Sequence, residues 1–339
     1  MKAAVLQEFK KPLLIEEVPP PVPGPEEVLV EMEACGVCHS DLHLADGDWT
    51  QLAGIVKKPL ILGHEIAGRV VEKGAEVRSL RIGDHVGVPW VQWTCGQCEP
   101  CREGNENLCP VQRITGVTVD GGYAEFLKAP ASHVTAIPDG LSSTEAAPLF
   151  CAGVTVYRAL RQAKILAGQR LAIFGVGGLG HIGVQLGQAF GAEVTAIDTS
   201  EAQLRLADSL GALCTLNAAS TDVVKEMRSK GGVHAALVTS AAKAAYDMAF
   251  HCLRPTGTLL AVGLPADSIC FHPILMAARE VCIRASAVGT RQDLREVLAL
   301  AAAGKVRCRV TAQPLARANE ALADLRGGRV SGRMVLTPD

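Results

Sequence analysis

The sequence predicts an α/β protein of two domains, a mostly-β domain followed by a domain with a parallel sheet covered by helices on both faces. The length of 339 residues exceeds the roughly 250–300 residues at which a single hydrophobic core stops growing. The first 150 residues are rich in short β-like runs, turns and prolines. Beyond residue 146, apolar strand-like runs alternate with segments of helical period, which is typical of a parallel sheet.

The strands expected in the first part are short and adjoin turns. Residues 1–5 are predicted to form a strand, and 28–32 has the apolar and acidic pattern of a half-buried strand. Segments 68–73 and 84–88 are similar, and each lies next to a glycine-containing turn. The prolines of 19–25 indicate a stiff surface connector. No segment of helical period dominates, so this part is predicted to be mostly β.

The second part of the chain is predicted as an ordered series of strands and helices. Strands are expected over residues 170–174, 193–198, 212–216, 235–239 and 258–262. Helices are expected over residues 145–162, 182–190, 201–210 and 223–229. The chain is predicted to end with a helix over 292–303, a strand, a helix over 316–325 and a final strand over 333–336.

Charge and hydropathy exclude several classes of function. The net charge is −2 and like charges do not cluster, which argues against a nucleic-acid-binding surface or an anionic-membrane anchor. The N-terminus lacks the basic start and apolar stretch of a secretion signal. No uninterrupted apolar segment reaches the roughly 18–20 residues of a membrane helix. We therefore expect a soluble, cytoplasmic protein with no membrane partner.

Twelve cysteines are many for such a chain. Without a secretion signal, a disulfide framework is not favoured. At least half of the cysteines have spacings that metal ligation explains better. The scattered ones are interpreted as small core hydrophobes: Cys35, Cys214, Cys252, Cys270, Cys282 and Cys308.

The most specific pattern is a run of four cysteines, Cys95-x2-Cys98-x2-Cys101-x7-Cys109. Four thiolates so close in sequence can form a tetrahedral shell around one Zn²⁺. An iron–sulfur cluster is the alternative, since Cys109 is followed by proline as in such sites, although the seven-residue gap fits that ligation less well. Because every ligand would come from the protein, the site is predicted to support folding and to have no opening for a substrate.

A second metal site is predicted from residues that are far apart in the sequence. Residues 36–43 are dense in ligating and proton-handling side chains, and Cys38 is the thiol among them. His64 stands beside Glu65, and Cys151 lies near the change of domain. Two thiolates and one imidazole would hold Zn²⁺ and leave its fourth position open. Taken alone, His64 would more often be a hydrogen-bonded structural histidine and Cys151 more often a buried hydrophobe, so the prediction depends on their combination.

A glycine motif predicts a dinucleotide site. Gly175-Val176-Gly177-Gly178-Leu179-Gly180 follows the apolar run 171–174 and opens a segment of helical period, and this context gives the pattern its specificity. Gly175 permits a tight turn, Gly177 lets the backbone approach a pyrophosphate, and Gly180 allows the helix to pack against the strand. The helix N-terminus then faces the phosphate charge.

Asp198 is expected to select NAD over NADP. It ends the next predicted strand, 18 residues beyond Gly180. A carboxylate there can bind both hydroxyls of an adenosine ribose and would repel a 2′-phosphate. The alternative interpretation is a solvated turn residue or a helix cap before Glu201.

Taken together, these motifs resemble the zinc-containing medium-chain alcohol dehydrogenases over essentially the whole chain. The segments that carry the resemblance are 1–3, 35–43, 63–65, the four-cysteine run, 121–125, 151–155, the glycine motif, 262–264 and 288–291. The length and the lack of a long insertion are most similar to the tetrameric bacterial and yeast-type enzymes that act on small primary alcohols such as propanol.

The resemblance implies a discontinuous architecture. A GroES-like, mostly-β catalytic domain would comprise residues 1–150 and 288–339, with a structural-zinc lobe at about 90–112. A Rossmann domain, 151–287, would bind NAD. The implied protein is a cytoplasmic homotetramer with two Zn²⁺ per subunit, and a small alcohol or aldehyde is its substrate.

The resemblance also implies roles at the open metal site. Cys38, His64 and Cys151 would hold the catalytic zinc. Glu65 would be an acidic residue able to approach the metal, and Asp41 would accept a hydrogen bond from His64 and orient it.

Further roles concern proton transfer and the substrate pocket. Ser40 would bond to the substrate oxygen, and His43 would lie at the outer end of a proton relay. Trp49 and Trp90 would narrow the pocket, with ordinary core packing as the alternative.

At the cofactor, His39 and Arg291 would lie near the pyrophosphate, while Thr155, Val262 and Val288 would line the nicotinamide site. One position departs from the pattern of the family. Gln203 stands where many relatives have a lysine near the adenosine ribose.

Three other functions are compatible with parts of the sequence. A non-catalytic nucleotide-binding regulator could use the same scaffold, although an intact metal and relay set argues against it. A secondary-alcohol or polyol dehydrogenase would commonly have a carboxylate in place of Cys151. A zinc-finger-like interaction module would explain only the four-cysteine lobe, which has no basic face.

Overall fold

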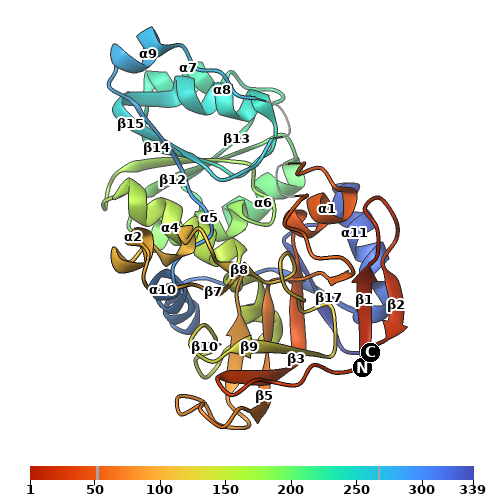
Figure 1. Cartoon of the computed structure of the whole chain (residues 1–339). Coiled ribbons are helices and arrows are strands. Elements are labelled where there is room, and N and C mark those ends of the chain that lie inside the picture. Colours follow the sequence, from red (N-terminus) through yellow and green to blue (C-terminus); the bar gives the residue numbers. More distant parts are fainter. Residues whose placement is uncertain (51–52, 266–267) are drawn as a thin grey trace. The chain divides into compact units, whose positions relative to one another are not determined.

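The computed structural model describes residues 1–50, 53–265 and 268–339, and these form two compact units. Unit 1 comprises Met1–Val154, Gly289–Ala303 and Cys308–Asp339, and unit 2 comprises Thr155–Val288 and Gly304–Arg307. Unit 1 is therefore built from both ends of the chain, which are red to yellow and dark blue in Figure 1. Within the described residues, no helix has the length and apolar character needed to cross a bilayer.

Unit 1 is mostly β, as predicted. Its main sheet has the order β10-β6-β5-β3-β18-β17, and β9 pairs with β3. The bounds are β3 Glu27–Val37, β5 Ile66–Lys73, β6 His85–Val88, β9 Phe126–Pro130, β10 Thr135–Ala136, β17 Val310–Pro314 and β18 Arg333–Thr337. A second sheet, β2-β1-β4, comprises β1 Lys2–Leu6, β2 Leu14–Glu17 and β4 Leu60–Ile61, and a third pairs β7 Val91–Trp93 with β8 Arg113–Ile114.

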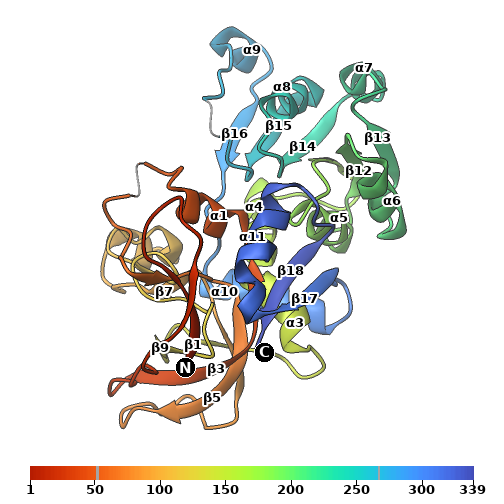
Figure 2. The same ribbon diagram turned by 90° about the vertical axis from the view of Figure 1, so that its right-hand side faces the viewer.

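The long strand β3 positions the later site. It is antiparallel to β5, β9 and β18, and its register with β5 shifts at two points. Such bulges bend a strand and allow it to pair with different neighbours along its length. Figure 2 shows the long strands β3 and β5 and the C-terminal strand β18 in this unit. The strand runs directly into helix α1, His39–Asp46.

The helices of unit 1 are short. They are α1, α2 Glu99–Arg102, α3 Ser143–Ala146, α10 Arg291–Ala302 and α11 Ala318–Arg326, with 3₁₀ turns over Glu106–Leu108, Ala147–Phe150 and Leu315–Arg317. The core is aliphatic because the sequence has few aromatic residues. Tyr123 is its largest fully buried side chain.

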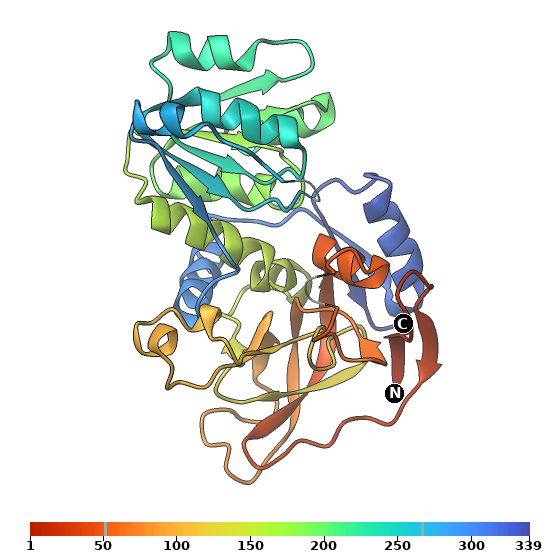
Figure 3. The same cartoon turned by 45° about the horizontal axis from the view of Figure 1, so that its top comes forward.

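Unit 2 contains a six-stranded parallel sheet with the order β13-β12-β11-β14-β15-β16. The strands are β11 Arg170–Phe174, β12 Glu193–Asp198, β13 Cys214–Asn217, β14 Val233–Val238, β15 Leu253–Ala261 and β16 Cys282–Ala285. The helices are α5 Gly180–Ala189, α6 Glu201–Ser209, α7 Val223–Ser229, α8 Lys243–Cys252 and α9 Pro273–Ala277. Figure 3 shows helices on both sides of this sheet. The predicted doubly wound architecture is therefore confirmed.

The predicted helix over 145–162 is wrong in one respect, because the structure divides it. Helix α3 ends at Ala146, a 3₁₀ turn contains Pro148, and helix α4, Ala152–Ala163, begins after Cys151. Proline disrupts the hydrogen bonding of a helix interior, and Cys151 has the non-helical angles φ −131° and ψ −69°. The break places Cys151 between two helical segments.

Several other expectations need correction. Helices α1 and α8 and strand β16 were not predicted; α1 lacks an apolar stripe because polar site residues occupy it. Not all scattered cysteines are core residues either. Cys35 and Cys252 are buried, whereas Cys270 and Cys282 are exposed. Cys282 is exposed because β16 is the edge strand of its sheet.

Candidate metal and cofactor sites

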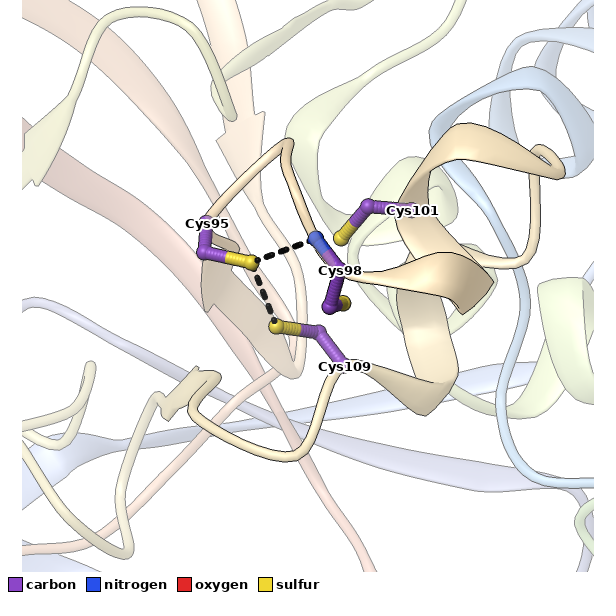
Figure 4. Close-up of side chains that lie close together, drawn as sticks. All are labelled: Cys95, Cys98, Cys101 and Cys109. Carbon is purple, nitrogen blue, oxygen red and sulfur yellow. Dashed lines mark hydrogen bonds between the residues drawn. The ribbon is translucent and has the colours of Figure 1, made fainter.

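The four cysteines of the predicted lobe lie together. Their sulfur atoms are all within 4.8 Å of one another, and Figure 4 shows the side chains directed toward a common centre. Cys95 follows β7, Cys98 caps helix α2, and Cys109 follows the 3₁₀ turn. The backbone N–H of Cys98 donates to Cys95 Sγ at 3.3 Å. Backbone donors of this kind lower the pKa of Cys95 to about 6, so this thiol readily becomes the thiolate that a metal binds.

The lobe is fastened to helix α10 by Glu106. The backbone N–H of Arg291, the first residue of the helix, donates to Glu106 Oε1 at 3.0 Å. The guanidinium of Arg291 also contacts Glu106, and it donates to the Ser132 carbonyl at 2.9 Å. The resemblance predicts that Arg291 reaches a cofactor pyrophosphate. In the structure its guanidinium instead contacts the Glu106 carboxylate and the Ser132 carbonyl.

A buried histidine lies beside the lobe. His133 is only 4% exposed, and its ring contacts Thr94 Oγ1 at 3.0 Å and Ser132 Oγ at 2.9 Å. Burial, followed by the charge of Arg291, lowers the pKa of His133 to about 4. The neutral ring is therefore the form that the folded protein holds.

This histidine predicts a pH dependence of stability. Between pH 6.5, the ordinary histidine pKa, and the folded value of about 4, only the unfolded chain binds the proton, so stability falls as the pH falls. Between pH 7 and pH 5 the loss is about 2 kcal/mol. Urea unfolding of the wild type and His133→Gln at both pH values measures it. Loss of metal at the lower pH would affect both proteins equally. The prediction is contradicted if the free energy of unfolding falls by the same amount in both proteins between pH 7 and pH 5.

The second predicted set also converges. Ligand atoms of Cys38, His64, Glu65 and Cys151 lie within 4.8 Å of one another, and all four residues are buried. Cys38 follows β3, His64 and Glu65 precede β5, and Cys151 precedes α4. The Gly36 N–H donates to the Glu65 carbonyl at 2.9 Å, which ties the first two segments together. A Cβ on Gly36 would lie 1.8 Å from Glu65 Oε2, so only glycine fits there.

Asp41 organises this cluster from within α1. Its buried carboxylate lies 3.0 Å from His64 Nδ1 and accepts from the Cys38 N–H at 2.9 Å, the Gly63 N–H at 3.2 Å and the Tyr123 hydroxyl at 3.0 Å. A carboxylate can only accept, so His64 carries its proton on Nδ1 and presents the lone pair of Nε2.

Two atoms of the cluster are unsatisfied. His64 Nε2 and Glu65 Oε2 are buried and have no hydrogen-bond partner within the described parts of the chain. Buried polar atoms are rarely left in this state. The neighbouring Cys151 and then His64 lower the pKa of Cys38 well below its ordinary value. A thiolate, an available imidazole lone pair and a second thiol form a donor set that suits Zn²⁺.

Arg333 is a site residue that sequence reasoning missed. It begins β18, is 2% exposed and donates from Nη2 to Glu65 Oε1. Burial raises the pKa of Glu65 to about 7, and Arg333 opposes that rise. The available signal was an arginine at the start of an otherwise apolar C-terminal strand, since a charged residue is almost never buried without a partner.

The remaining predicted residues of unit 1 surround α1 and the cluster. His39 is exposed and Ser40 is half-buried. The Trp49 ring stacks on His43, with centroids 5.3 Å apart, and Trp90 meets His64 edge-on at 4.7 Å. Each tryptophan therefore contacts a predicted site histidine.

The glycine motif forms the first strand-to-helix turn of unit 2. Gly175 follows β11 with φ 92°, and α5 begins at Gly180. A Cβ on Gly180 would lie 1.9 Å from the Gly175 carbonyl oxygen, whereas a Cβ on Gly177 would meet nothing within 4 Å. Helix α5 has no side-chain cap, so its first N–H groups suit an anion. Leu179 is its N-cap residue, and Gly178 is half-buried in the turn.

Asp198 ends β12 beside this turn. Its Oδ2 accepts from the Val176 N–H at 2.7 Å and its Oδ1 from the Ser200 N–H at 2.9 Å. The carboxylate is thus fixed next to the glycine motif. Thr155 lies in α4, Val262 follows β15, and Val288 is half-buried with φ 41°.

The two glycines predict contrasting variants. Gly177→Ala is expected to fold normally and to weaken NAD binding by about tenfold or more, because its methyl group occupies only the space where the backbone approaches a phosphate. Gly180→Ala is expected to lower stability by about 1–3 kcal/mol through overpacking. Calorimetric NAD titration and thermal unfolding separate the two effects. Unchanged affinity in a folded Gly177→Ala protein would contradict the predicted NAD site.

Comparison with known proteins places the chain in a family. Residues 24–139 match the model "Alcohol dehydrogenase GroES-like domain", and residues 178–303 match "Zinc-binding dehydrogenase". An alcohol dehydrogenase of Geobacillus stearothermophilus is 46% identical over 340 residues, covering 100% of both chains.

Solved structures agree with these matches. The alcohol dehydrogenase of Aeropyrum pernix superimposes with a TM-score of 0.93 at 38% identity, covering 100% of both chains. The acetophenone reductase of Geotrichum candidum in complex with NAD has a TM-score of 0.90 at 32% identity, with 99% of this chain and 96% of that chain covered. The chain therefore belongs to the zinc-type medium-chain alcohol dehydrogenase family.

Proposed function

We propose that the protein is an NAD-linked alcohol dehydrogenase that interconverts small primary alcohols and aldehydes. The observation that carries the proposal is the buried cluster of Cys38, His64 and Cys151, in which His64 Nε2 has no hydrogen-bond partner among the described residues. These residues would hold a Zn²⁺ ion with one open position. Such an ion makes a bound hydroxyl far more acidic, and NAD would accept the hydride.

The charges of the cluster support a divalent ion. With both thiols and Glu65 ionised, the cluster would carry three negative charges in a buried space, and Arg333 supplies one positive charge. A divalent cation would offset this excess, which would otherwise be uncompensated buried charge. Asp41 fixes the orientation and tautomer of His64, which is the usual means of directing a metal-binding imidazole.

The protein's own groups would move the proton. Ser40, next to the cluster on α1, would accept the proton of the alcohol hydroxyl while its own proton passes on, through the nicotinamide ribose, to His43, which would release a proton to solvent. His43 lies one helical turn from Ser40, and its side chain is 25% exposed, so a proton can leave from it.

Several finer assignments follow from the family resemblance. Asp198, beside the glycine motif, favours NAD, and a relative has been solved with NAD. Cys151 in place of a carboxylate, together with Trp49 and Trp90 at the site histidines, favours small primary alcohols. The catalytic domain would comprise 1–150 and 288–339, and the cofactor domain 151–287. We further propose two Zn²⁺ per chain, one of them in the four-cysteine lobe, and a cytoplasmic homotetramer.

A secondary-alcohol dehydrogenase is the second candidate, since one similar structure is named an acetophenone reductase. Metal analysis of the purified protein is expected to find about two zinc ions per chain. Initial rates with ethanol, 1-propanol, 2-propanol and a polyol, each with NAD and NADP, should be highest for primary alcohols with NAD. Higher rates with 2-propanol would favour the second candidate, and a fully zinc-loaded protein without turnover would overturn the proposal.

A further inference from the structure

We propose that Asp48 is a positioning residue for proton transfer, because it holds His43 in the tautomer that leaves Nε2 as the proton acceptor. The inference rests on the proposed function, in which His43 releases the alcohol's proton. Among the described residues, the side-chain hydrogen bond of Asp48 is to His43, and it would act through that ring.

The end of helix α1 brings Asp48 to this position. Gly47 adopts the left-handed conformation, with φ 68° and ψ 25°. The Gly47 N–H donates to the Leu44 carbonyl at 3.2 Å, and the Asp48 N–H donates back to the His43 carbonyl at 3.0 Å. This is the paired hydrogen bonding of a glycine-terminated helix. It turns the chain back over the last helical turn, so that Asp48 lies beside His43, five residues earlier in the chain.

The side chains then define the proton position on His43. Asp48 Oδ2 lies 3.0 Å from His43 Nδ1. The carboxylate can only accept, so Nδ1 carries the hydrogen, and in the neutral ring Nε2 carries the lone pair. Within the described part of the chain, no hydrogen bond occupies Nε2. When Nε2 takes up a proton, the imidazolium forms beside the Asp48 carboxylate, and the same nitrogen later releases that proton to water.

The imidazole ring of His43 also stacks on an aromatic side chain. Trp49 stacks on His43 with an interplanar angle of 29°, and His39 is the other ring nearby, at 6.5 Å between centroids. Asp48 thus restrains the rotation of the imidazole about its bond to the helix, and Trp49 restrains the tilt of its plane. Preorganisation of this kind is what a general base requires.

A merely structural ion pair would not explain this arrangement. The Asp48 side chain is 51% exposed, and exposed pairs contribute little to stability. Helix α1 has a second partly exposed pair, in which Asp46 Oδ1 accepts from Arg326 Nη2 of α11 at 2.6 Å. Asp46 therefore offers a matched control, an acidic residue on the same helix whose partner is not His43.

Kinetic analysis of a double-mutant cycle tests the inference. Single-turnover alcohol oxidation is measured for the wild type, His43→Gln, Asp48→Asn, the double variant and Asp46→Asn. We expect Asp48→Asn to lower the rate roughly tenfold while zinc content and the KM for alcohol stay unchanged. In the His43→Gln background the second change should add less than about twofold, because groups acting as a unit are not additive. Asp46→Asn should match the wild type.

Two further readouts separate positioning from structure. An external base such as imidazole is expected to restore part of the rate of Asp48→Asn, as is the conservative change Asp48→Glu. Nitrogen-15 spectra of the imidazole rings, assigned with His43→Gln, should show the Nδ1–H form of His43 in the wild type and a mixture of tautomers in Asp48→Asn. This spectrum does not depend on activity.

The outcomes distinguish the two proposals. A zinc-loaded wild type without turnover would overturn the proposed function. A His43→Gln protein at the wild-type rate would remove the role of His43 and, with it, that of Asp48. A slow His43→Gln together with a wild-type rate for Asp48→Asn would overturn the Asp48 inference alone. An equal effect of Asp48→Asn in both backgrounds would also overturn it.

Discussion

Replacing Cys38 with serine is expected to lower kcat/KM for alcohol oxidation by about 10⁴-fold or more. The variant would no longer hold the Zn²⁺ ion that would make the alcohol hydroxyl acidic. Serine keeps the size of the side chain, but its hydroxyl does not ionise near neutral pH and is a poor zinc ligand. The expected metal content falls from about two zinc ions per chain to one, because the four-cysteine lobe is separate.

A neighbouring thiol provides the control for this change. Cys35 is also buried on β3, and its sulfur is not in the four-residue cluster. Cys35→Ser should keep both zinc ions and at least a third of the activity at a temperature where it is folded. Zinc analysis, circular dichroism and steady-state rates on the two variants decide the matter. A Cys38→Ser protein that retains two zinc ions and turnover would remove Cys38 from the proposed centre.

Replacing Arg333 with methionine is expected to lower the free energy of unfolding by about 3–5 kcal/mol, because Glu65 would lose the cation that it contacts in a buried space. The partners are 2% and 0% exposed. Methionine fills much of the volume of the arginine stem, so the missing charge is the main change. Glu65→Gln in the same chain removes the orphaned carboxylate and should recover part of the loss.

An exposed ion pair provides the control for the Arg333 variant. Arg69 Nε lies 2.9 Å from Glu33 Oε1, with side chains that are 49% and 38% exposed. Arg69→Met should therefore change stability by less than about 1 kcal/mol. Urea unfolding at pH 7 compares all four proteins at equal zinc content. The prediction is contradicted if Arg333→Met matches Arg69→Met, or if adding Glu65→Gln brings no recovery.

The arrangement of secondary structure was predictable where local pattern and burial agree. The parallel strands β11, β12 and β14 are short apolar runs, and alternation with helices identified the sheet. Helix α1 was missed because its residues serve the site and leave no apolar stripe. The helix predicted over 145–162 was divided, since Pro148 and the backbone at Cys151 depart from helical geometry.

Features whose parts are close in the chain were predictable without the structure. The cysteine lobe and the turn from Gly175 to Gly180 are each contained in a short segment, so spacing alone limits their geometry. The turn that returns Asp48 to His43 is equally local, because one glycine at the end of α1 directs it, but it was not predicted because α1 itself was missed.

Which distant residues share the buried cluster became clear from the three-dimensional fold. Cys38, His64 and Cys151 were candidates on chemical grounds, but their spacing in the chain imposes no distance in space. Antiparallel pairing of β3 with β5 brings the first two together, and pairing of β18 with β3 places Arg333 beside them. The physical reason is that long-range strand pairing and burial create this environment. They also bury the Glu65 carboxylate, which must then be paired with a cation, and no local sequence motif indicates that pairing.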